Sequence, residues 1–199
     1  MATRNILTDE DKGLLKKSRA VTDFNKRLHV LLDDMRETLI EANGLGLAAP
    51  QVGVLRRVAL IVDTSIESGE PVDEIDEEIS EEILEEIYEK KRIDDYNRQI
   101  IELVNPEIIK TEGEQTGREG CLSVPGVNGI VTRPNVVLLT AQDRDGNTFK
   151  LEISELAARA ACHEIDHLDG IIFTTIADRI LTEEELAELA AENNREKND

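Results

Sequence analysis

The 199-residue chain has no tryptophan, and aromatic residues make up only 3% of it. Its core must therefore be built mainly from Ile, Leu, Val and Ala. No apolar run approaches the roughly 20 residues needed to cross a bilayer. Residues 1–11 contain neither the apolar stretch of a signal peptide nor the acid-free composition of a transit peptide. These absences argue against a membrane protein and favour a cytoplasmic one.

Basic residues are also scarce, with 23 Lys and Arg against 43 Asp and Glu and a net charge of −20. Direct nucleic-acid binding is not expected, because it needs Lys and Arg to meet phosphates. The acidity is uneven: residues 66–98 hold 14 acidic and 4 basic residues, and residues 183–199 hold 7 and 2. Two segments thus carry most of the charge, and the rest of the chain has an ordinary balance.

Apolar periodicity predicts short strands separated by helices. The spacing of apolar residues predicts a helix over 25–42, ended by Gly44 and Gly46 through their freedom at positive φ. Strands are expected at 58–62, at 100–109 with a break at Asn105-Pro106, and in a hairpin of 136–141 with 148–153. A further helix is expected from the cap Ser154 through Leu168, with Gly170 after it. This order predicts an α+β fold with small mixed or antiparallel sheets around a central metal-binding helix.

The chain is expected to form a single catalytic domain over residues 1–199. Residues 66–98 are predicted to be an acidic helical insertion, since Ile75, Ile79, Ile83 and Ile87 recur every four residues among acidic neighbours. Residues 182–199 are predicted to form an acidic C-terminal helix or tail that opens with a capping box at Thr182 and Glu185. The insertion contains no catalytic motif, so the active site is expected to form without it.

The strongest local motif is His163-Glu164-Ile165-Asp166-His167. Side chains four residues apart on a helix lie one turn above each other, so both imidazoles can reach one metal ion. Glu164 lies about 100° further round the helix, where it can hold a water molecule without binding the metal itself. His29, alone on a polar helix, is interpreted as a surface histidine.

Two histidines leave a catalytic metal site one protein ligand short. Cys121 is the natural candidate because a thiolate binds divalent ions strongly, whereas Cys162 adjoins His163 and is interpreted as core packing. A thermolysin-type zinc peptidase is the alternative, because that class takes a downstream Glu as third ligand. Glu183, Glu184 and Glu185 lie near the required distance.

Three segments in this order resemble the signature motifs of the peptide deformylase family. They are Gly44-Leu45-Gly46-Leu47-Ala48-Ala49-Pro50-Gln51-Val52-Gly53, Glu119-Gly120-Cys121-Leu122-Ser123, and the His163–His167 motif. The resemblance implies a hydrolase that removes the formyl group from the N-terminal formylmethionine of new polypeptides and releases formate. A family member that keeps the fold only as a binding protein would need a broken motif, and none is broken.

The resemblance also assigns roles to residues. It implies that Cys121, His163 and His167 bind the metal, with iron(II) as the usual ion and zinc, nickel or cobalt as substitutes. It makes Glu164 the proton-transfer group and places Gln51 and the backbone N–H of Leu122 at the formyl oxygen. Gly46 and Gly120 are assigned to substrate binding, and Glu119 is expected to pair with Arg133.

The expected partners are N-formylmethionyl nascent peptides. Some bacterial members of the family dock on the ribosome through a basic C-terminal helix. The C-terminal segment here is acidic, so it gives no support for that association.

Overall fold

The computed structural model describes residues 2–66 and 81–188. Within them the elements are η1 (Lys12–Leu15), α1 (Lys26–Ala42), β1 (Gly46–Ala48), η2 (Ala49–Val52), β2 (Val58–Val62), α2 (Glu81–Gln99), β3 (Ile100–Glu112), β4 (Gln115–Cys121), β5 (Val124–Arg133), β6 (Val136–Gln142), β7 (Thr148–Ser154), α3 (Glu155–Asp169), η3 (Phe173–Thr175) and β8 (Arg179–Ile180). None of the helices in these residues has the length and hydrophobicity that crossing a bilayer requires.

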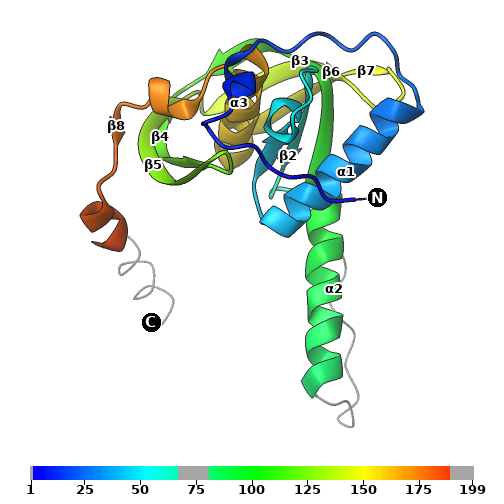
Figure 1. The fold of residues 1–199 in the computed structure, drawn as a ribbon, viewed down its shortest axis with the longest axis horizontal. Coiled ribbons are helices and arrows are strands. Elements are labelled where there is room, and N and C mark those ends of the chain that lie inside the picture. Colours follow the sequence, from blue (N-terminus) through cyan, green and yellow to red (C-terminus); the bar gives the residue numbers. More distant parts are fainter. Residues whose placement is uncertain (1, 67–80, 189–199) are drawn as a thin grey trace.

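The strands form a five-stranded sheet in the order β1-β2-β3-β6-β7 and a three-stranded sheet in the order β4-β5-β8, with antiparallel pairing throughout both. Helix α1 packs on one face of the larger sheet and α3 on the other, and α2 projects away from this body (Figure 1). The α+β fold predicted from the sequence is therefore confirmed.

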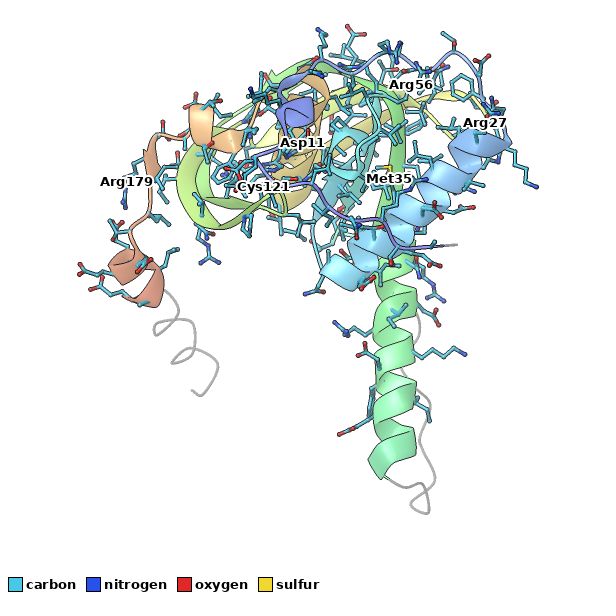
Figure 2. All side chains as sticks on the ribbon, in the orientation of Figure 1. Asp11, Arg27, Met35, Arg56, Cys121 and Arg179 are labelled. Carbon is cyan, nitrogen blue, oxygen red and sulfur yellow. The ribbon has the colours of Figure 1, made fainter. Side chains whose placement is uncertain are left out.

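Strand β2 is apolar at every position because both of its faces are buried. Val58, Leu60 and Val62 belong to the core beneath α1, whereas Ala59 and Ile61 belong to the core beneath α3. Side chains alternate between the two faces of a strand, so a strand covered on both faces has no polar side. Met35 is fully buried and points from α1 into the body (Figure 2).

Helix α1 begins after Asn25, as predicted, but the residue that ends it is not the predicted glycine. The Asn25 side chain accepts hydrogen bonds from the N–H groups of Arg27 and Leu28, at 2.9 and 3.4 Å. At the other end Asn43, with φ 49°, takes the left-handed conformation. The prediction that Gly44 does so is wrong. Asparagine tolerates this conformation because its short polar side chain bonds locally.

Strand β3 is not broken at Asn105-Pro106 but continues to Glu112. Asn105 has φ 51° and forms a bulge, where the register with β6 shifts. Its side chain accepts from the N–H of Val21 at 2.8 Å and donates to the Val21 carbonyl at 2.9 Å. These bonds hold the extra residue in place, so the strand bends and pairing resumes.

The two acidic segments are described only in part. Residues 67–80 of the predicted insertion, with Ile75 and Ile79, lie outside the described residues, and α2 leads directly into β3. At the C-terminal end residues 183–188 are helical, and residues 189–199 lie outside the described part. The N–H of Thr182 donates to Glu185 at 2.8 Å, and the N–H of Glu185 donates to the Thr182 hydroxyl at 3.2 Å. The predicted capping box is therefore present.

Candidate metal centre and active-site pocket

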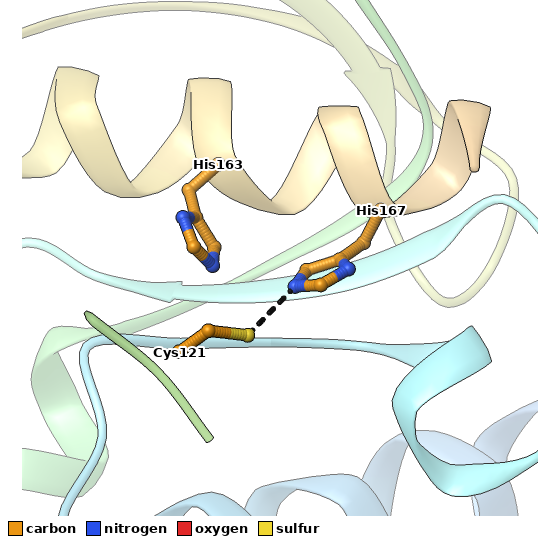
Figure 3. A group of neighbouring side chains, drawn as sticks. All are labelled: Cys121, His163 and His167. Atoms are coloured by element: carbon orange, nitrogen blue, oxygen red, sulfur yellow. Dashed lines mark hydrogen bonds between the residues drawn. The ribbon is translucent and has the colours of Figure 1, made fainter. Parts of the chain in front are cut away.

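Cys121, His163 and His167 lie together, with their ligand atoms all within 4.8 Å of one another. Both imidazoles extend from α3 toward Cys121 at the end of β4, and Cys121 Sγ lies 3.1 Å from His167 Nε2 (Figure 3). A thiolate and two imidazole nitrogens are the donors that borderline divalent metals prefer. Among the described residues, this is the one group of metal-binding side chains.

Glu119 holds His163 in place. Its carboxylate lies 3.1 Å from His163 Nδ1 and accepts two hydrogen bonds from Arg133, at 2.9 and 3.1 Å. With Nδ1 occupied in this way, Nε2 is the ring nitrogen left for a ligand. The Glu119–Arg133 pair expected from the family resemblance is confirmed.

The charges in the cluster favour a bound cation. Burial opposes ionisation of Glu119, but hydrogen bonds from His163 and Arg133 outweigh it and lower the pKa of Glu119 to about 2. Burial likewise opposes protonation of His163, yet Cys121 and Glu119 raise its pKa to about 10. Burial and the neighbouring His163 lower the pKa of His167 to about 3, so His167 is neutral. The raised pKa of His163 means that its surroundings stabilise positive charge, which a metal ion would supply on displacing the proton.

Glu164 lies on the same helix but takes no part in the cluster of ligand atoms. The side chain is buried, and burial raises its pKa to about 7. One carboxylate oxygen, Oε2, has no hydrogen-bond partner among the described residues. A buried carboxyl group with a pKa near neutrality can both accept and give up a proton at physiological pH.

Gln51 reaches the cluster from η2. Its side-chain oxygen accepts from the N–H of Ala48 at 2.8 Å, so its amide nitrogen points the other way. That nitrogen lies 3.2 Å from the Ser123 hydroxyl and 3.7 Å from Cys121 Sγ. The side chain is almost fully buried, which fixes a donor beside the candidate metal ligands.

A pocket of about 350 Å³ opens onto these groups. Its lining brings together all three signature segments, including Gly46, Gln51, Gly120, Cys121, Leu122, His163 and Glu164. His167 lies deeper, with 1% of its surface exposed. Residues far apart in sequence thus converge on one concave site.

The other cysteine, the other histidine and the downstream glutamates lie outside the group of candidate metal ligands. Cys162 is packed in the core beneath α3, where burial raises its pKa to about 11. His29 Nε2 lies 2.9 Å from the carbonyl of Arg144 and is not part of the cluster. Glu183, Glu184 and Glu185 are not in the cluster, and Glu185 instead caps its own helix and pairs with Arg179.

Two residues of the site were not predicted from the sequence. Arg159 donates to Glu119 at 2.8 Å, so Glu119 is held by two arginines. Its position one turn before His163 on α3 is a signal that could have revealed it. Ser123, which meets Gln51, lies within the second motif, but nothing in its spacing predicted the contact.

A cysteine sulfur and two imidazoles around one point, with a buried carboxyl group alongside and an open pocket, are typical of metal-dependent hydrolases. A family model described as polypeptide deformylase matches residues 3–183. A peptide deformylase of Caldicellulosiruptor bescii is 48% identical over 186 residues, which cover 94% of this chain and 92% of the relative.

Solved structures agree. A crystal structure of a peptide deformylase from Legionella pneumophila has a TM-score of 0.69 and 32% identity, and the match covers 99% of this chain and 96% of that one. A Met-Ala-Ser-bound structure of a class I type b peptide deformylase from Acinetobacter baumannii has a TM-score of 0.68 and 27% identity, with 88% and 99% covered.

The chain belongs to the polypeptide deformylase family. It is a hydrolase that removes the N-formyl group from nascent peptides, as the sequence motifs predicted. The thermolysin-type alternative is wrong: the chain matches a different family, and its downstream glutamates do not meet the two histidines.

Proposed function

We propose that Cys121, His163 and His167 bind one divalent ion, iron(II) in the native protein, with zinc, nickel or cobalt as possible substitutes. The proximity of the three donor atoms carries this proposal. Three protein ligands leave a coordination position for water or substrate. When bound, such an ion acts as a Lewis acid that lowers the pKa of water and polarises the formyl oxygen. The Glu119 carboxylate orients His163 toward the ion.

Glu164 is the proton-transfer group in this scheme. Its carboxylate accepts a proton from the attacking water, whose oxygen bonds to the formyl carbon. The carbon–nitrogen bond then breaks, and Glu164 returns the proton to the departing amine. The products are formate and a peptide with a free N-terminus. The raised pKa of Glu164, about 7 because of burial, suits both proton transfers.

Gln51 and Leu122 stabilise the negative charge that develops on the formyl oxygen. The Gln51 amide nitrogen is already aimed at the site because Ala48 holds the other end of the amide group. The backbone N–H of Leu122 follows Cys121 directly and supplies the second donor. Donors that are fixed before the reaction need no reorganisation as charge develops.

Gly46 and Gly120 bind the backbone of the peptide. Gly46 lies in β1 and Gly120 in β4, and each strand is at the edge of its sheet. Both glycines line the pocket. An extended peptide can add to such edges through main-chain hydrogen bonds, which places its formylated end at Cys121. The substrate is the formylmethionyl end of a new polypeptide in the cytoplasm.

Incubation with formyl-Met-Ala-Ser tests this function. The anaerobically purified protein should release formate and Met-Ala-Ser in equal amounts. Cleavage of an internal peptide bond without formate would contradict the proposal. Metal analysis of the same preparation should find iron, and another ion in its place would correct the metal assignment while leaving the reaction intact.

A further inference from the structure

The last turns of α2 reach a wall of the active-site pocket. The hydroxyl of Tyr96 donates a hydrogen bond to the carbonyl oxygen of Gly44. Gly44, Leu45 and Gly46 together form this wall. The rest of α2 projects away from the body (Figure 1). A helix that lies outside all three signature motifs therefore contacts the segment that carries Gly46.

Tyr96 is held firmly enough to act as a support. Its ring is half-buried and packs against the hydrophobic cluster that α1 forms with the larger sheet. The carbonyl of the next residue, Asn97, accepts from Arg36 of α1 at 2.9 Å. Burial raises the pKa of Tyr96 to about 12, so its hydroxyl stays protonated and remains a donor at physiological pH.

The segment that Tyr96 contacts has little freedom to shift. A Cβ atom at Gly44 would lie 2.9 Å from Leu122 Cδ1 and 3.2 Å from Leu39 Cδ1, so the Gly44 backbone packs closely on both side chains. The carbonyl of Leu45 accepts from the N–H of Val62 at 2.9 Å. Tyr96 and Val62 thus fix two successive carbonyl groups immediately before Gly46.

We propose that Tyr96 is a positioning residue for substrate binding: its hydrogen bond to Gly44 sets the backbone orientation of the segment that presents Gly46 to the peptide. This inference rests on the proposed role of Gly46. The Tyr96 hydroxyl bonds to Gly44 and not to a candidate metal ligand or Glu164, so its loss should act mainly on the affinity for peptide. Tyr96 lies within residues 66–98, so the proposal narrows the prediction that the active site forms without this segment, which stays a prediction.

The chain offers a matched control, because Tyr88, its other tyrosine, lies on the same helix and is 54% exposed. Steady-state kinetics with formyl-Met-Ala-Ser, together with metal analysis, compares Tyr96→Phe with Tyr88→Phe. Loss of one hydrogen bond should raise KM by about 3- to 10-fold in Tyr96→Phe. Its kcat and metal content should match the wild type, and Tyr88→Phe should match it in all three quantities.

A wild-type KM in Tyr96→Phe would overturn the proposal, as would a fall in kcat or in bound metal with KM unchanged. A wild-type enzyme that releases no formate would contradict the proposed function instead, so the two failures are distinguishable.

A second measurement does not depend on Tyr96→Phe folding. The chain has no tryptophan, so in Tyr88→Phe the single remaining tyrosine is the source of intrinsic fluorescence. Binding of the product Met-Ala-Ser should change this emission over the concentration range in which the peptide inhibits the reaction. Emission that stays constant while inhibition saturates would show that the Tyr96 contact is independent of the peptide site and would overturn the proposal.

Discussion

The carboxylate of Glu164 lies directly against the backbone of Gly46. A Cβ atom at position 46 would be 2.4 Å from Glu164 Oε1, a distance that no real pair of such atoms tolerates. Glycine is required here because the Glu164 carboxylate occupies the space that a side chain would fill. The same close approach sets β1, the strand proposed to bind the peptide, beside the carboxyl group proposed to transfer the proton.

Substitution of Gly46 by alanine should therefore impair the chemical step. The added methyl group forces Glu164 to move, and a displacement of about 1 Å costs roughly 100-fold in rate. Metal content should stay near that of the wild type, since Glu164 is not among the three ligands. Kinetics and metal analysis on the same sample check this, and a Gly46→Ala enzyme with wild-type kcat/KM would contradict it.

Removal of the Glu164 carboxyl group should separate catalysis from metal binding. In Glu164→Ala, kcat should fall by about 100-fold or more, because the proposed proton-transfer group is removed. Bound metal should remain close to one ion per chain. Glu183→Ala, which changes an exposed carboxylate outside the cluster, is the control. A parallel loss of metal and activity in Glu164→Ala would instead make Glu164 a ligand.

Glu119 should govern metal affinity without touching the ion. In Glu119→Ala, His163 loses its orienting carboxylate and two buried arginines lose one of their partners. Metal affinity should drop by about 10- to 100-fold. Competition with a chelator measures this, and the activity of the fully loaded variant should fall much less than its affinity. Unchanged chelator resistance would rule out the orienting role.

Acid should remove the stabilisation that Glu102 provides far from the site. Burial opposes its ionisation, but hydrogen bonds from Arg144 and Arg36 outweigh it and keep the pKa of Glu102 below its usual value of 4.5. Its contribution is thus complete above that value and is lost as the pH falls through the lower folded-state pKa. Glu102→Gln should lower the free energy of unfolding by about 2 kcal/mol at pH 7.

Denaturant unfolding over a pH series checks the Glu102 prediction. The difference between wild type and Glu102→Gln should shrink as the solution becomes more acidic. A difference that stayed constant at every pH would mean that the charge of Glu102 is not its source.

The sequence predicted the structure best where a local pattern is compatible with only one arrangement of the side chains. The spacing of His163 and His167 places two imidazoles on one face of a helix in any fold, and the apolar run of β2 requires cover on both faces. The choice of a third candidate ligand could not be made from residue spacing alone. Cys121 and the glutamates at 183–185 were both compatible with the local pattern, and only the fold brings Cys121 to the histidines.

Details that depend on tertiary contacts were missed. The positive φ at Asn43 was missed because asparagine, like glycine, tolerates the left-handed conformation. The bulge at Asn105 was missed because its side chain bonds to Val21, 84 residues away in the sequence. The contact between Tyr96 and Gly44 spans 52 residues of sequence, so no periodicity could reveal it. Local patterns thus predicted the candidate site residues, and the fold shows the distant contacts that surround them.

The most direct test of the whole account is titration of the metal-free protein with iron(II) under anaerobic conditions, with formate release from formyl-Met-Ala-Ser as the readout. Activity should rise linearly and level off at one ion per chain, and Cys121→Ala should stay inactive over the same range because only two protein ligands remain. Full activity in the metal-free protein, or in Cys121→Ala, would contradict the account.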